Sequence, residues 1–160
     1  VRFVTRKVVM EPPPTKSHLN HVVLDGIRGN SWEEKLATML EKRPSVAAYA
    51  KNDHLSFGIP YVHKGRTHEY VPDFLVRLVT ESHDVERTLI IEVSGGLKSP
   101  GPTAAKADTA RNQWCASVNN WGQSGRWGYV EISNMNDAGR VLDEAIENLY
   151  ADRPIIGLPA

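Results

Sequence analysis

The chain has 160 residues and a mass of 17.8 kDa, which is enough for one domain with a hydrophobic core. Its 19 basic residues balance its 19 acidic residues, so the total charge gives no sign of a polyanionic partner and leaves room only for a local basic patch. A single cysteine, Cys115, excludes an internal disulfide and fits a reducing cytoplasm. No apolar run has the length of a membrane span, so we expect a cytoplasmic protein without membrane contact.

Residues 1–16 predict an N-terminal arm and linker. The first ten residues, VRFVTRKVVM, have the composition of a short strand, and the prolines of EPPPT at 11–15 break the chain after it. We expect a single domain over residues 17–160. Because the chain begins with Val1 rather than Met, we also expect it to be a piece of a longer protein.

The segment SWEEKLATMLEKRP, residues 31–44, predicts the first helix. Ser31 and Glu34 have the spacing of a capping box, and Pro44 ends the run. At about 100° per residue, Glu33 falls within the apolar stripe, whereas Glu34 points to solvent. We therefore expect one inward and one outward glutamate. The apolar stripe consists of Trp32, Leu36, Met39 and Leu40.

A change to two-residue alternation predicts a hairpin in the next part of the chain. Apolar residues alternate over 55–61, HKGRTH at 63–68 supplies the turn, and 69–79 returns as the second strand. TLIIEVS at 88–94 predicts a third strand, which is apolar enough to be central.

Two further helices and one strand complete the predicted order. Residues 103–119 predict a helix, residues 127–132 a fourth strand, and the apolar spacing from Ala138 to Leu149 an amphipathic closing helix. The order of helix, three strands, helix, strand and helix predicts an α/β fold, with a mixed central sheet of four to five strands flanked by helices. The stripe of the middle helix consists of Ala107, Ala110, Trp114 and Val118.

Two carboxylates lie in strands that are predicted to be buried. Asp73 follows Pro72 in YVPDFLVRL, and Glu92 lies among branched aliphatic residues in LIIEV. A buried carboxylate is costly unless a cation or hydrogen-bond donors accompany it. A hard divalent metal such as Mg²⁺ takes oxygen ligands, and Glu33 is a third candidate ligand from the first helix. Turn chemistry or an ion pair explains each carboxylate taken alone, but together they form an ordered pattern.

This order of a helical Glu, a Pro-Asp strand and a Glu strand resembles the PD-(D/E)XK nuclease superfamily. It looks most like the C-terminal endonuclease domain of type III restriction enzymes, over most of the chain from about residue 17. Besides the two strands, the resemblance rests on SHLNHVVLDG, SWEEKLATMLE, VAAYAKNDHLSFGIPY and KADTARNQWCASVNNWGQSGRWGYVEI. It implies a restriction-endonuclease-like fold and metal-dependent hydrolysis of phosphodiester bonds in DNA.

The resemblance also implies roles for individual residues. Asp73 and Glu92 are the expected Mg²⁺ ligands, with the backbone carbonyl of Val93 as a further ligand and Glu33 as an additional catalytic residue. Mn²⁺ is the expected substitute for Mg²⁺. Such metal ions stabilise charge on the scissile phosphate and make a bound water nucleophilic near neutral pH.

The chain departs from the superfamily pattern at Ser94. The usual residue there is a lysine, which lies two positions after the Glu and so faces the same side of the strand. Lys98 and Lys106 are the candidates to replace it. We favour Lys106, because a helix holds a catalytic ammonium better than a glycine- and proline-containing loop does.

Three residues are candidates for DNA contacts. Gln113 shares a helix stripe with Lys106, Lys98 lies in the loop before that helix, and Arg126 follows the loop NNWGQSG. By resemblance, double-stranded DNA is the expected substrate. By resemblance, the partners are the helicase region of a parent chain and a modification (methyltransferase) subunit, and ATP acts only through that helicase, since no GxxxxGK[ST] motif occurs here.

Two other hypotheses remain open. The first is a catalytically inactive nuclease-fold domain that binds DNA or another protein, which the missing lysine at Ser94 suggests. The second is an α/β interaction domain whose carboxylates are ion-paired with arginines such as Arg77.

Overall fold

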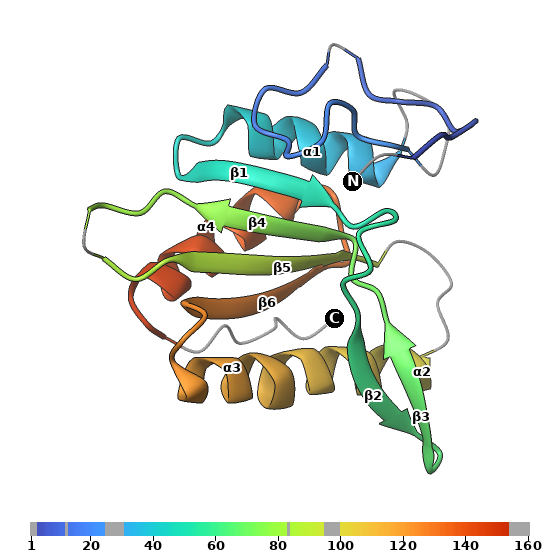
Figure 1. The fold of residues 1–160 in the computed structure, drawn as a ribbon, viewed down its shortest axis with the longest axis vertical. Helices are drawn as coiled ribbons and strands as arrows, with labels where there is room; N and C mark the ends of the chain where they lie inside the picture. The colour runs from blue at the N-terminus through green and yellow to red at the C-terminus, as the bar shows by residue number, and fades with distance from the viewer. Residues whose placement is uncertain (1–2, 12, 25–30, 83, 95–99, 154–160) are drawn as a thin grey trace.

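The fold combines a mixed four-stranded sheet, a separate two-stranded hairpin and helices on both sheet faces (Figure 1). The computed structural model describes residues 3–11, 13–24, 31–82, 84–94 and 100–153. The predicted α/β class with a mixed, helix-flanked sheet is confirmed. No helix in these ranges has the length and apolarity needed to cross a bilayer. The elements are α1 (Trp32–Lys42), β1 (Val46–Lys51), β2 (Ile59–His63), β3 (Arg66–Tyr70), β4 (Phe74–Leu78), β5 (Arg87–Val93), α2 (Pro100–Asp108), η1 (Thr109–Cys115), α3 (Ala116–Trp121), β6 (Arg126–Ile132) and α4 (Ala138–Tyr150).

The order of strands in the main sheet is β1-β4-β5-β6. β1 and β5 both pair with β4 in antiparallel fashion, whereas β6 pairs with β5 in parallel. A parallel pair needs a crossover connection, and here the continuous helical segment α2-η1-α3 supplies it. The strand β5 is therefore central, which explains why six of its seven residues are buried.

Each face of the sheet has its own hydrophobic core. Alternate residues of β4 and β5 pack with α1 and α4 on one face, in a cluster that includes Phe74, Val76, Leu89 and Ile91. The intervening residues pack with α2, η1 and the β2-β3 hairpin on the other face, in a smaller cluster that includes Tyr70 and Ile90. Figure 1 shows the helix α4 behind the sheet and the helical segment that ends in α3 on the other side.

The first helix begins as the sequence predicts. The Ser31 hydroxyl accepts a hydrogen bond from the Glu34 amide at 3.1 Å, which is the cap expected at the N-terminus of α1. The helix ends at Lys42, just before Pro44. Glu33 and Glu34 are both half-buried, so the predicted contrast between an inward and an outward glutamate is not seen.

The predicted strand over 69–79 is wrong in one respect, because the chain there forms two strands in two sheets. β3 ends at Tyr70, β4 begins at Phe74, and Pro72 lies between them. Proline donates no hydrogen bond to a strand ladder, so the break falls where the chain can leave one sheet for the other. The first strand of the hairpin also begins at Ile59 rather than at residue 55.

The strand β1, residues Val46–Lys51, was not predicted. Its sequence VAAYAK has three alanines and no regular alternation, so period-two analysis gives it little weight. The five strands before the crossover helix therefore replace the three that were expected.

The hairpin turn lies within the predicted span of 63–68 but is shorter than predicted. β2 and β3 pair in register from Ile59–Tyr70 to His63–Arg66, which leaves Lys64 and Gly65 as the two-residue loop. Both loop residues have positive φ, at 50° and 72°, as a type I′ turn requires.

The predicted helix over 103–119 contains a π-helical insertion. Residues Thr109–Cys115 form η1 between α2 and α3. A π-helical turn takes up more residues than an α-helical turn, so the buried face shifts along the sequence. Ala107 and Ala110 are buried as predicted, but the next buried residue is Cys115 and not Trp114, which is only half-buried.

Candidate active site

Asp73 and Glu92 lie on neighbouring strands at the same end of the sheet. In the antiparallel pairing of β4 with β5, Phe74 faces Ile91. One further step along this register brings Asp73 opposite Glu92. The Asp73 Oδ2 atom accepts a hydrogen bond from the Val93 amide at 2.7 Å, which fixes the aspartate against the end of β5. The structure thus brings together the two carboxylates that the sequence singles out.

The Pro72–Asp73 junction is held by Asn52, a buried residue that follows β1. The Asn52 side-chain amide donates to the carbonyl oxygens of Phe57 at 2.8 Å and Pro72 at 3.0 Å. Its backbone amide donates to the Asp73 carbonyl at 2.7 Å. These bonds explain how a Pro-Asp pair is tolerated inside an apolar stretch, because the carbonyl groups at the junction receive donors from the side chain and the backbone of Asn52. Sequence reasoning missed Asn52, although Asn-Asp after a strand is a common turn signal.

Tyr70 contacts Glu92 directly. The Tyr70 hydroxyl donates a hydrogen bond to Glu92 Oε2 at 2.9 Å, and both residues are buried. Burial, the neighbouring Tyr129 and the Glu92 carboxylate raise the pKa of Tyr70 well above its usual value. The phenol therefore stays protonated and acts as a donor to the carboxylate. Sequence reasoning missed this residue too, because a tyrosine at the end of an amphipathic strand looks like an ordinary core residue.

Lys106 approaches the same tyrosine from the helical side. The Lys106 ammonium lies 5.5 Å from the centre of the Tyr70 ring and 6.0 Å from the centre of the Tyr61 ring. At these distances the cation is attracted by the negative faces of the rings. Lys106 is half-buried on α2, on the sheet face where Tyr70 reaches Glu92. Tyr70 therefore links the predicted lysine to one of the two predicted carboxylates.

The other predicted site residues are spread more widely. Arg126 begins β6 and pairs in register with Arg87, five residues before Glu92 on β5, and it forms an ion pair with Asp152 at 3.2 Å. Gln113 is exposed on η1. Lys98 lies outside the described residues. Ser94 follows β5, and its amide donates to the Ile132 carbonyl at 3.0 Å.

The two carboxylates offer oxygen ligands of the kind that a magnesium ion takes. Among the residues that the structure describes, no three His, Cys, Asp or Glu side chains converge as a metal-binding group, so Glu33 remains a predicted ligand only. Mg²⁺ does not require such a cage, because it keeps several waters and is commonly held by one or two carboxylates together with substrate phosphates. Asp73, Glu92 and the backbone at Val93 are the groups that would hold it.

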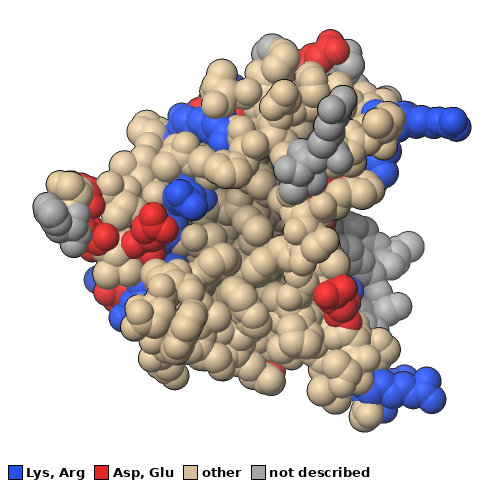
Figure 2. Space-filling model, in the orientation of Figure 1, with Lys and Arg blue, Asp and Glu red and all other residues tan. Residues whose placement is uncertain are grey.

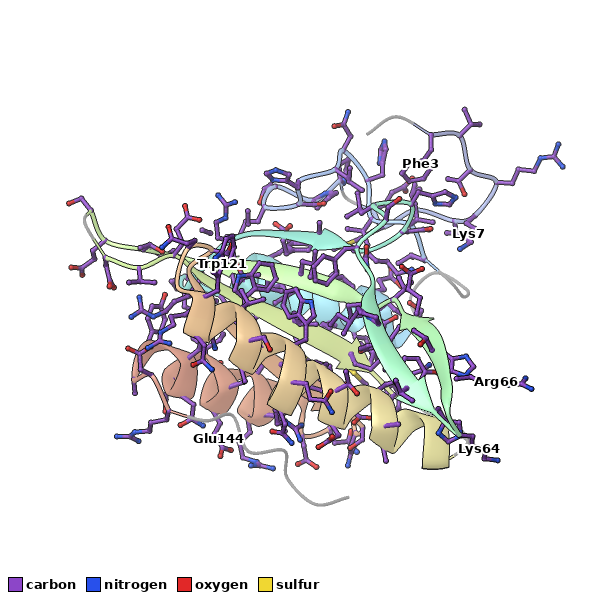
Figure 3. The ribbon with its side chains drawn as sticks, turned by 60° about the horizontal axis from the view of Figure 1, so that its bottom comes forward. Phe3, Lys7, Lys64, Arg66, Trp121 and Glu144 are labelled. Carbon is purple, nitrogen blue, oxygen red and sulfur yellow. The ribbon has the colours of Figure 1, made fainter. Side chains whose placement is uncertain are left out.

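The hairpin beside the site carries basic side chains at its tip. Lys64 and Arg66 are exposed there and point away from the body of the molecule (Figure 3). In the space-filling view most charged side chains lie round the outline of the face, and basic ones mark the end of the hairpin (Figure 2). Tyr70 lies at the base of β3, four residues from Arg66, or about 14 Å along the strand. The sequence signal for these two residues was the turn HKGRTH, which was interpreted only as a turn.

Comparisons with models of protein families, with curated proteins and with solved structures found no match to this chain.

Proposed function

We propose that this chain is a metal-dependent endonuclease domain that hydrolyses phosphodiester bonds in double-stranded DNA. The observation that carries the proposal is the arrangement around Tyr70. Asp73 and Glu92 end neighbouring strands, the Tyr70 hydroxyl donates to Glu92, and the Lys106 ammonium lies over the ring of the same tyrosine.

The order of elements supports the same proposal. In the main sheet, a helix precedes the three antiparallel strands β1, β4 and β5, and a helical crossover then adds a parallel strand beside the strand that carries Glu92. This is the order that the resemblance to PD-(D/E)XK nucleases leads us to expect for a restriction-endonuclease-like fold. The β2-β3 hairpin is an insertion between the first and second strands of the main sheet.

Each residue has a role that follows from its contacts. A bound Mg²⁺ would supply the charge that polarises the phosphate and activates water. Asp73 and Glu92 provide the oxygen ligands, and the Val93 amide and the Tyr70 hydroxyl orient one carboxylate each. Lys106 provides a fixed positive charge near the position where negative charge develops on the phosphate. It takes the role of the usual lysine, whose position in the sequence is occupied by Ser94.

The β2-β3 hairpin supports DNA as the proposed substrate. Lys64 and Arg66 reach outward beyond the site, where phosphate oxygens of a duplex are suitable partners for exposed cations. The helicase region, the methyltransferase subunit and the use of ATP remain predictions from the resemblance. They concern proteins or regions other than this chain.

A second candidate function is a DNA-binding domain that has lost catalysis. The observation that favours it is Ser94, which offers no charge at the position of the usual lysine. Titration with Mn²⁺ separates the two functions only when it is combined with cleavage, since an inactive domain can retain the carboxylate pair.

The test is cleavage of supercoiled plasmid in Mg²⁺, Mn²⁺ or EDTA. The parent protein, which is this chain without substitutions, should nick or linearise the plasmid with either metal and lose this activity in EDTA. Glu92→Gln should be inactive, whereas Glu144→Gln, at an exposed position on α4 that is labelled in Figure 3, should behave like the parent. Metal binding and DNA binding without cleavage by the parent would establish the second candidate instead.

A further inference from the structure

A polar pocket lies beside β6, on the side of this strand that faces away from β5 and from the candidate active site. It has a volume of about 570 Å³ and is walled by η1 and α3, by the start of β6 and by the end of α4. Arg126, at its floor, pairs with Arg87, whereas Glu92 pairs with Glu131 further along the same two strands. The two sites are therefore about 16 Å apart along the strand direction.

Three arginines and one aspartate line this pocket, which leaves a surplus of two positive charges. Arg126 is paired with Asp152 at 3.2 Å. Within the described part of the chain, Arg111 and Arg153 form no ion pair, and the Arg111 Nε is buried without a hydrogen-bond partner. Nε itself is covered by protein, but Arg111 lines the pocket, so an anion there would meet the other nitrogens of a guanidinium group that has no acceptor of its own among the described residues.

The walls hold the arginines in place. The guanidinium carbon of Arg111 lies 5.5 Å from the centre of the Tyr129 ring, and the face of the ring attracts the cation. Asn119 ties α3 to the edge of β6, because its side chain accepts from the Trp127 amide at 2.7 Å and donates to the Trp127 carbonyl at 2.9 Å. Burial raises the pKa of the Cys115 thiol to about 12, so this lining residue stays neutral and does not offset the arginines at neutral pH.

We propose that this pocket binds a small phosphate monoester of nucleotide size through Arg111 and Arg153. A phosphate monoester carries a charge of about −1.5 to −2 at neutral pH, which matches the surplus of the pocket. Arginine binds phosphate oxygens through charge-assisted and often bidentate hydrogen bonds. A volume of about 570 Å³ is within the range of small-molecule sites, and a concave pocket suits a compact ligand better than a rigid duplex does.

The test is calorimetric titration with adenosine 5′-monophosphate, adenosine and inorganic phosphate. The monophosphate should bind, inorganic phosphate should compete with it, and adenosine should bind at least tenfold more weakly. Arg111→Gln and Arg153→Gln should each weaken binding of the monophosphate by about tenfold or more, the usual effect of losing a charged hydrogen bond. The matched control is Arg140→Gln, which removes an exposed arginine of α4 outside the pocket.

Several outcomes would overturn the proposal. The first is the absence of binding at millimolar concentrations of the monophosphate. Equal affinity for adenosine and its monophosphate would show that the phosphate group is not recognised. Equal affinity of Arg153→Gln and Arg140→Gln for the monophosphate would show that the ligand does not bind in this pocket. Since Arg153 is exposed, its substitution tests the pocket even where Arg111→Gln perturbs folding. Asp73→Asn should bind the monophosphate as the parent does, so the result is independent of the nuclease proposal.

Discussion

Tyr70 is the residue at which the two halves of the candidate active site meet. Its hydroxyl holds a carboxylate that belongs to the sheet, and its ring lies under an ammonium that belongs to α2. Because its pKa is raised, it remains a hydrogen-bond donor throughout the physiological pH range. A tyrosine in this position orients the Glu92 carboxylate by donating to one of its oxygens.

We expect Tyr70→Phe to lower the free energy of unfolding by about 1–2 kcal/mol, because Glu92 loses a buried donor. Urea denaturation at neutral pH measures the change. The matched control is Tyr150→Phe, which removes the hydrogen bond from the Tyr150 hydroxyl to the Val79 carbonyl at 2.7 Å. Unlike Tyr70, Tyr150 is exposed. That control should cost less than about 0.5 kcal/mol. Equal losses for the two variants would contradict a specific role for the Tyr70 hydroxyl.

We expect Lys106→Ala to reduce the rate of DNA cleavage on the order of a hundredfold or more, which is typical of losing one group that stabilises charge in a transition state. Single-turnover rates at matched Mg²⁺ and saturating DNA separate lost chemistry from lost binding. Lys98→Ala should have a much smaller effect, and Lys35→Ala, at an exposed position on α1, should have none. A Lys106→Ala protein as fast as the parent would remove this lysine from the mechanism.

At the scale of elements, the N-terminal segment is attached to α1 through one carboxylate. Glu41 accepts hydrogen bonds from the Thr15 hydroxyl at 2.6 Å and from the Thr15 and Lys16 amides at 3.1 Å each. Burial alone raises the pKa of Glu41, but these hydrogen bonds outweigh burial, and the net pKa is lowered. Further along the segment, the Lys16 carbonyl accepts from the Tyr49 amide and the His18 amide donates to the Tyr49 carbonyl, so this attachment also covers the free edge of β1.

We expect Glu41→Gln to lower the free energy of unfolding by about 1 kcal/mol at pH 7. A carboxylate whose pKa is lowered on folding stabilises the protein above its unfolded pKa of about 4.3, and this contribution is lost as the pH falls through the folded pKa. The difference between parent and variant should therefore be constant from pH 6 to 8 and should shrink below about pH 4. Denaturation curves at several pH values measure it, with the exposed Glu147→Gln as control. A difference that persists unchanged at pH 3 would contradict the role of the Glu41 charge.

The elements also show where periodicity is a good guide and where it is not. The cap at Ser31, the hairpin turn and the amphipathic α4 each depend on local chemistry, and each was predicted. In the π-helical segment η1, Trp114 packs against Phe57 and Trp127, at ring-centre distances of 5.5 and 5.1 Å. Such tertiary contacts leave no sign in a helical-wheel analysis, so the shift of the buried face to Cys115 was not predictable.

At the scale of the whole molecule, the sequence predicts the two carboxylates but not their supports. The pattern around Asp73 and Glu92 is local, because each lies in an apolar strand where a carboxylate needs a reason. Asn52 and Tyr70 support the site through contacts with Pro72 and Glu92, which lie about twenty positions away. The pairing of β1 with β4 and of β4 with β5 brings these segments together, and pairing is a property of the fold rather than of any one segment.

The central claim is that Asp73 and Glu92 form a metal-dependent nuclease site. The most direct measurement is the single-turnover rate of DNA cleavage in Mg²⁺ by Asp73→Asn, compared with the parent and with Asp137→Asn, at an exposed position before α4. Asparagine keeps an oxygen that can accept from the Val93 amide but loses the charge that a metal ion requires. The proposed role of Asp73 requires that Asp73→Asn is folded, as judged by its unfolding transition, and has no measurable cleavage, while Asp137→Asn cleaves like the parent. Cleavage by folded Asp73→Asn at the parental rate would contradict it.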